Sequence, residues 1–135
     1  MADAAPGRGG RPQSPSVWIW RWHVTMVCSI LHRAAGAILY VGALVLMGWA
    51  LALATGPDAY AAYTGFLGSL PGKALLFGFA LSVFYHLANG VRHLVWDAGY
   101  GFAPRTADAS GLATLAFAVA AAVVLFLYAG LTGAL

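Results

Sequence analysis

The sequence predicts an all-α membrane protein with three transmembrane helices. Of its 135 residues, 61% are hydrophobic and only 8% are charged, whereas about a quarter of the residues in a soluble domain carry a charge. Three stretches, near residues 34–54, 75–96 and 111–135, contain few or no charged side chains. Each is close to the ~20 residues that a helix needs to cross ~30 Å of hydrocarbon. None shows the alternating pattern of a membrane strand.

Residues 1–23 are predicted to form a cytoplasmic N-terminal tail that ends in an interfacial segment. The opening MADAAPGRGGRPQSP is polar and lacks the apolar core of a secretory signal. In the segment that follows, three tryptophans flank Arg21, namely Trp18, Trp20 and Trp22. Indole rings beside an arginine are typical of the headgroup layer, where a side chain is half wet.

The first span is expected at residues 24–54 and the second at residues 71–97. The stretch TGPD ends the first helix, and Pro71 is tolerated in the first turn of the second. We expect the connection at residues 55–72 to form an aromatic belt or a short surface helix. Its aromatic residues include Tyr60, Tyr63 and Phe66.

The third span is expected at residues 110–134, after an inner loop with the sequence GYGFAPRTADAS. Ser110 is the residue expected to cap the N-terminus of this helix. Small side chains recur along the span and allow neighbouring helix backbones to approach closely. They include Ala116, Ala118, Ala120, Ala121 and Ala122. The chain therefore divides into a tail at residues 1–23 and a three-helix anchor at residues 24–135.

Basic residues predict the orientation of the spans. They gather around the start of the first span and between the second and third, as Arg8, Arg11, Arg21, Arg33, Arg92 and Arg105. The connection between the first two spans carries only Lys73 and Asp58. The positive-inside rule then places the N-terminus in the cytoplasm and the C-terminus in the periplasm. A bacterial inner membrane is favoured over a mitochondrial one, because the tail lacks an evident amphipathic targeting helix.

One face of the first span carries polar residues, which are costly at membrane depth and commonly functional. Spaced three or four apart along this face are Ser29, Arg33, Gly36 and Tyr40, with His32 one step to the side. Taken singly, Arg33 is explained by snorkelling to phosphates and Ser29 by a bond to its own helix. The cluster as a set favours a ligand site at the cytoplasmic mouth of the span.

A second polar stripe lies at the cytoplasmic end of the second span. It consists of His86, Gly90, His93 and Asp97, while Arg92 points well off the stripe. His86 lies ~10 Å deeper in the membrane than His93. Three interpretations of His86 remain open. It is a neutral imidazole bonded to a neighbouring helix, part of a proton relay, or an axial ligand of haem iron.

The haem interpretation uses the most residues of the cluster. Gly90, one turn from His86, leaves room for a flat macrocycle. Four residues at the same end offer partners for two propionates: His32, Arg33, Arg92 and His93. His32 and His93 share a depth near the rim, so His86 has no partner at its own depth in this chain. If His86 binds haem, the second axial ligand is expected from another polypeptide.

Two longer motifs contain these polar residues. The first reads RPQSPSVWIWRWHVTMVCSILHRAAG at residues 11–36, and the second reads HLANGVRHLVWDAG at residues 86–99. Together they resemble the family of succinate dehydrogenase cytochrome b556 subunits, the large membrane-anchor subunits of respiratory complex II. With the three-span plan, the resemblance covers residues 11 to about 134. The sequence departs from the family pattern at Trp20, His23 and Ala35.

The resemblance implies a subunit of succinate:quinone oxidoreductase, an enzyme of the tricarboxylic acid cycle and of electron transport. The chain is not catalytic on its own but contributes to the quinone-reduction site. The implied partners are a second three-helix membrane-anchor subunit, which completes the bundle, an iron–sulfur subunit and a flavoprotein subunit. The implied cofactor is haem b, shared between the two anchor subunits, with ubiquinone as the substrate.

The resemblance also assigns residues by their place in the motifs. His86 is the axial ligand of haem iron, and the second anchor subunit supplies the other axial histidine. The residues expected near the haem propionates are His32, Arg33 and His93. Those expected at the quinone site are Ser29, Arg33 and Asp97. A hydroxyl can bond a quinone carbonyl, and an arginine stabilises the negative charge that develops on its oxygen.

Two other functions remain open from the residues themselves. One is a non-redox proton-relay or transporter subunit in which His86 and Asp97 carry protons. The other is a structural anchor without haem. A nucleic-acid partner has little support, because the net charge of +3 rests on only seven Lys and Arg residues. The single cysteine, Cys28, excludes an internal disulfide and is expected to be a small packing residue.

Overall fold

The computed structural model describes residues 21–133, which form four helices and no strand. The helices are α1 (Val24–Thr55), α2 (Pro57–Gly68), α3 (Leu70–Asp97) and α4 (Pro104–Leu131). Of these, α1, α3 and α4 are each long and apolar enough to cross a membrane. The predicted all-α fold with three long apolar helices is therefore confirmed. Trp18, Trp20, Arg8 and Arg11 lie outside the described residues.

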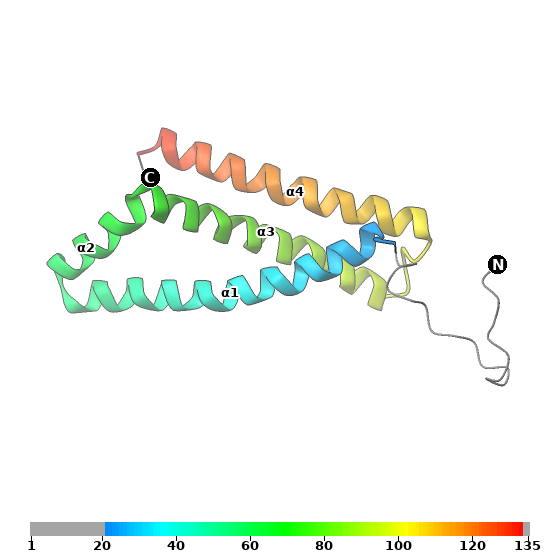
Figure 1. The fold of residues 1–135 in the computed structure, drawn as a ribbon, viewed down its shortest axis with the longest axis horizontal. Helices are drawn as coiled ribbons and strands as arrows, with labels where there is room; N and C mark the ends of the chain where they lie inside the picture. Colours follow the sequence, from blue (N-terminus) through cyan, green and yellow to red (C-terminus); the bar gives the residue numbers. More distant parts are fainter. Residues whose placement is uncertain (1–20, 134–135) are drawn as a thin grey trace, which may run out of the picture.

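The three long helices run side by side, with α3 between α1 and α4 (Figure 1). The first turns of α1, the last turns of α3 and the first turns of α4 meet at one end of the bundle, which we call the inner end. The short helix α2 lies at the opposite end, where it joins α1 to α3. Large apolar side chains such as Leu46, Leu94 and Leu127 remain exposed along the long helices. Such surfaces are typical of contact with lipid or with another subunit.

Small residues bring α4 close to its neighbours. The side of α4 that is buried carries Ala107, Gly111, Ala118 and Ala122. A Cβ atom added to Gly111 would lie 3.0 Å from the Sγ atom of Cys28, which is fully buried on α1. The close approach confirms that Cys28 is a packing residue. Of the five alanines predicted to allow helix contact, Ala118 and Ala122 are buried, whereas Ala116 and Ala120 are exposed.

The contact between α1 and α3 sets the rotation of α3. A methyl group at Gly42 would overlap the ring of Phe79, so this glycine allows the two helices to touch. Towards the inner end, the Tyr85 hydroxyl donates a hydrogen bond of 2.8 Å to the backbone oxygen of Cys28. Because Tyr85 is buried against α1, the next residue, His86, also lies on the side of α3 that faces α1.

The connection between the first two spans is a short helix, α2, which is one of the two forms expected for it. The Tyr63 hydroxyl donates to the backbone oxygen of Val45 at 2.7 Å, which ties α2 to α1. Helix α3 begins after Ser69, whose hydroxyl accepts a hydrogen bond from the backbone N–H of Gly72 at 3.3 Å. Pro71 lies in the first turn of α3, where its missing N–H costs nothing.

The predicted capping role of Ser110 is wrong. Helix α4 begins at Pro104, six residues earlier than expected, because a proline is pre-set for the first turn of a helix. Ser110 lies inside the helix, where its hydroxyl donates to the backbone oxygen of Ala107 at 3.1 Å. The same hydroxyl accepts a hydrogen bond of 2.9 Å from Nε of Arg92. It therefore links α4 to α3 instead of capping α4.

Candidate functional site

Three histidines from α1 and α3 cluster near the inner end. The rings of His32 and His86 are stacked, with centroids 4.0 Å apart and planes inclined by 9°. The ring of His93 lies 5.3 Å from that of His32, at an angle of 48°. The histidines come together because α1 begins at the end of the bundle where α3 ends (Figure 1). Two motifs that are far apart in the sequence therefore lie side by side.

The hydrogen bond of His86 fixes which of its ring nitrogens is available. Its Nδ1 atom lies 3.3 Å from the backbone oxygen of His32. A carbonyl oxygen can only accept, so Nδ1 carries the proton and Nε2 keeps its lone pair. No described residue bonds Nε2, and this atom is not buried. This is the arrangement of a histidine that ligates a metal through Nε2 while its other nitrogen is held by a carbonyl.

The sequence placed His32 near the rim, but its ring lies flat against that of the deeper His86. The backbone of α1 is also close at this point, because Nδ1 of His86 lies 3.3 Å from the backbone oxygen of His32. A stacked ring nevertheless differs from an opposed axial ligand. Two rings in face contact at 4.0 Å leave no space for a flat group between them. The second axial ligand of haem is still expected from another chain.

The surroundings of His86 fit a flat cofactor. A Cβ atom at Gly36 would lie 3.2 Å from Cε1 of His86, so this glycine seats the imidazole against α1. A Cβ atom at Gly90 would have no neighbour within 4 Å, which leaves the next turn of α3 open. In the described part of the chain, the Nδ1 atom of His32 is buried without a hydrogen-bond partner. Such an atom costs ~1–3 kcal/mol when left unpaired.

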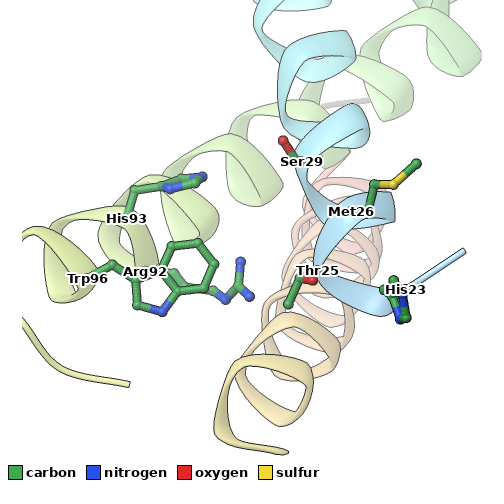
Figure 2. Close-up of a pocket in the computed structure, with 7 residues that line it drawn as sticks. All are labelled: His23, Thr25, Met26, Ser29, Arg92, His93 and Trp96. Atoms are coloured by element: carbon green, nitrogen blue, oxygen red, sulfur yellow. The ribbon is translucent and has the colours of Figure 1, made fainter. Parts of the chain in front are cut away.

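A pocket of about 500 Å³ opens at the inner end between α1 and α3 (Figure 2). Its lining residues are His23, Thr25, Met26, Ser29, Arg92, His93 and Trp96. Ser29 forms no hydrogen bond with any described residue, so its hydroxyl does not bond to the backbone of its own helix. The mixture of a hydroxyl, an imidazole and apolar walls suits a small ring that carries oxygen atoms.

The structure unites some of the predicted site residues and separates others. Ser29 and His93 share the pocket, and His32 joins His86 and His93 in the imidazole cluster. Arg33 is exposed on α1, and Asp97 is exposed at the last residue of α3. Neither of these two lines the pocket. A ligand or subunit that covers the inner end would be needed to bring them into one site with Ser29.

Arg92 has a role that the sequence did not reveal. It points away from the polar stripe of α3, as predicted, but its guanidinium group is buried against α4. Nη2 donates to the backbone oxygen of Ala107 at 2.8 Å, and Nε donates to the hydroxyl of Ser110 at 2.9 Å. The guanidinium carbon also lies 3.9 Å from the ring centroid of Trp96. Arg92 is therefore first of all a link between α3 and α4.

Asn89 was also missed, although a carboxamide at membrane depth is a signal by itself. It is fully buried. Its Oδ1 atom accepts from Nη1 of Arg92 at 3.3 Å, and its Nδ2 atom lies 3.3 Å from Nε2 of His93. Asn89 thus connects Arg92, which links α3 to α4, with His93, which lines the pocket.

The fold and the site define an integral membrane subunit with three long apolar helices, which carries a polar, histidine-rich site at one end. The family model for the succinate dehydrogenase/fumarate reductase transmembrane subunit matches residues 7–125. Our chain belongs to this family of membrane subunits of an oxidoreductase complex.

Individual relatives agree with the family match. The chain is 37% identical over 123 residues to the succinate dehydrogenase cytochrome b556 subunit of Paracoccus denitrificans, which covers 91% of this chain and 93% of the relative. It is 36% identical over 101 residues to the subunit of the same name from Rickettsia felis, covering 75% and 78%. It is also 36% identical over 118 residues to the mitochondrial cytochrome b560 subunit of Bos taurus, covering 84% and 68%.

Proposed function

We propose that this chain anchors succinate:quinone oxidoreductase in the membrane, holds one axial ligand of haem b and forms part of the quinone site. The family and the names of its relatives support the complex and the cytochrome. The observation that carries the proposal is the imidazole of His86. Its Nδ1 is bound to a backbone carbonyl oxygen, and its Nε2 is not buried and has no hydrogen-bond partner among the described residues.

In the proposed haem site, His86 would hold the iron through Nε2, and a second three-helix anchor subunit would supply another histidine. The proposed partners of the propionates lie toward the inner end and are His32, Arg33 and His93. Haem b supplies a one-electron carrier when it is bound, while the protein sets its orientation and its electrostatic surroundings.

In the proposed quinone site, a ubiquinone ring enters the pocket at the inner end. The Ser29 hydroxyl donates to a quinone carbonyl. Met26 and Trp96 provide the apolar surface against the ring. Arg33 and Asp97 do not line the pocket, and the subunit that docks on the inner end is proposed to bring them to its rim. There the positive charge of Arg33 would stabilise the negative charge that develops on a quinone oxygen during reduction.

The proposed orientation places the inner end at the cytoplasmic face of a bacterial inner membrane. Arg21, Arg33 and Arg105 then lie on the cytoplasmic side, in agreement with the positive-inside rule. The iron–sulfur subunit and the flavoprotein subunit dock on this face. Electrons from succinate reach the quinone across the inner end, and the C-terminus of the chain is periplasmic.

The quinone role is tested with Ser29→Ala and Arg33→Leu in the purified complex. Each variant is expected to lower quinone reductase activity about tenfold, because the loss of a hydrogen bond to a developing charge costs ~1.5 kcal/mol or more. Succinate oxidation by an artificial dye should be unchanged. Thr55→Ala is the control, since its hydroxyl bonds only its own helix near the opposite end. Full quinone activity in both site variants would contradict the proposed site.

A further inference from the structure

Three residues of α3 form a hydrogen-bonded chain that leads from α4 to the pocket. The residues are Arg92, Asn89 and His93. We propose that Asn89, held by Arg92, is a positioning residue that keeps the proton of His93 on Nδ1. His93 then donates a hydrogen bond to an oxygen atom of the ligand at the inner end. The identity of that ligand rests on the proposed function, whereas the hydrogen-bonded chain does not.

The hydrogen-bonded chain begins at Arg92, whose side chain is held in place by several contacts. Arg92 is only 6% exposed, and two of its nitrogen atoms donate to Ala107 and Ser110 of α4. The stacking of its guanidinium group on Trp96 removes a further degree of freedom. Arg92 therefore presents Nη1 to Asn89 in a fixed direction.

The orientation of the Asn89 carboxamide follows from the chemistry of arginine. A guanidinium group has only donors, so the atom of Asn89 that faces Arg92 is the acceptor Oδ1. The NH₂ group of Asn89 then faces His93 and can only donate. Nε2 of His93 must therefore accept this hydrogen bond, and it has no proton. In a neutral imidazole the proton is then on Nδ1.

The protonated nitrogen of His93 is free to act in the pocket. No described residue bonds Nδ1 of His93, and this atom is not buried. His93 lines the pocket, and its ring points from α3 toward the turn of α1 that carries Ser29 (Figure 2). The ring of Trp96 meets it edge-on, with centroids 5.2 Å apart. The pocket thus has a donor on each side, the hydroxyl of Ser29 and the Nδ1–H group of His93.

The ligand atom that fits this donor is an oxygen with lone pairs. Two sources share that chemistry in the proposed complex, the carboxylate of a haem propionate and the carbonyl of a quinone. Arg92 strengthens the preference, since it forms no ion pair with a carboxylate in the described part of the chain. Its positive charge is therefore not cancelled beside the pocket, and it favours an acceptor that carries or develops negative charge.

The test is a double-mutant cycle in the complete complex, with Asn89→Leu and His93→Asn. Asn89→Leu keeps the approximate volume but removes the donor that holds Nε2 of His93, so the ring is free to exchange tautomers. His93→Asn places an NH₂ group near the position of Nδ1 and has no tautomer to control. Ser82→Ala is the control for loss of a buried polar group on α3, because the Ser82 hydroxyl bonds only its own helix at 2.8 Å.

Two readouts separate the sources of the oxygen atom. If the ligand is a quinone, Asn89→Leu should raise KM for a short-chain ubiquinone analogue about fivefold, the loss expected for one hydrogen bond of ~1 kcal/mol. If the ligand is a propionate, the same variant should instead shift the midpoint potential of the haem. In the His93→Asn background, Asn89→Leu should change KM by less than twofold and should leave the midpoint potential of the haem where the His93→Asn variant alone puts it. Ser82→Ala should change neither.

The result that overturns the inference is an equal effect of Asn89→Leu in both backgrounds, because Asn89 would then act on packing and not through the imidazole of His93. An absence of any effect in the wild-type background overturns it as well. Failure of the proposed function has a different signature. The unmutated complex would then lack a b-type spectrum or succinate-dependent reduction of the quinone analogue.

Discussion

Replacement of Arg92 by leucine should weaken the contact between α3 and α4 by several kcal/mol. The variant loses the three hydrogen bonds to Ala107, Ser110 and Asn89, and each is worth ~0.6–1.7 kcal/mol in a membrane protein. It also loses the stacking on Trp96, which adds ~0.5–2 kcal/mol. The expected total is roughly 2–7 kcal/mol, because the freed carbonyl and carboxamide groups stay in a dry contact between helices.

The assay is the thermal unfolding midpoint of the purified complex in detergent, with Arg105→Leu as the matched control. Arg105 lies exposed in the first turn of α4 and forms no hydrogen bond with a described residue. Arg92→Leu should lower the midpoint by several degrees, and Arg105→Leu should leave it unchanged. Arg92→Lys should fall between them, since an ammonium group keeps the charge but cannot span three acceptors. Equal midpoints for the two leucine variants would refute the role of Arg92 as the α3–α4 link.

Three further substitutions test the packing that positions the site. Gly36→Val should push the imidazole of His86 out of place, because even a Cβ atom lies 3.2 Å from it; the haem absorbance of the complex should fall. Gly42→Ala should lower the thermal midpoint, because the methyl group would overlap the ring of Phe79. Tyr85→Phe removes the hydrogen bond to α1 and should cost ~0.6–1.7 kcal/mol of stability while quinone reductase activity is retained.

Gly78→Ala is the control for both glycine variants, since a Cβ atom there would have no neighbour within 4 Å. A haem spectrum that survives Gly36→Val unchanged would contradict the seating of His86 against α1. A thermal midpoint that is equal for Gly42→Ala and Gly78→Ala would contradict the close contact between α1 and α3. For Tyr85→Phe, loss of activity at unchanged stability would show that the hydroxyl serves the site and not the fold.

The three long helices could be predicted from the sequence because the bilayer imposes their length and composition. Runs of ~20 apolar residues have few other structures available to them. The start of α4 could not be predicted in the same way. Pro104 and Ser110 are both ordinary first-turn or capping residues, and only the structure shows that the helix begins at Pro104 and that Ser110 lies within it.

The faces on which the polar residues lie could be predicted from the sequence, but the contacts between these residues could not. Helical spacing placed His86 and His93 on one stripe and Arg92 off it, and the structure agrees. The stacking of His32 on His86 could not be derived, because the depth of a Cα atom does not fix how far a side chain reaches across to another helix. The role of Asn89 depends on partners three and four residues away, which only the structure orients.

The most direct test of the proposed function is the reduced-minus-oxidised absorption spectrum of the purified complex with and without the imidazole of His86. The unmutated complex should show a b-type spectrum, and His86→Ala should abolish it while all subunits still copurify. Leu87→Ala, which alters an exposed neighbour on α3, should leave the spectrum intact. A b-type spectrum that is unchanged in His86→Ala would contradict the assignment of His86 as the haem ligand and would favour a non-redox role for the polar stripe of α3.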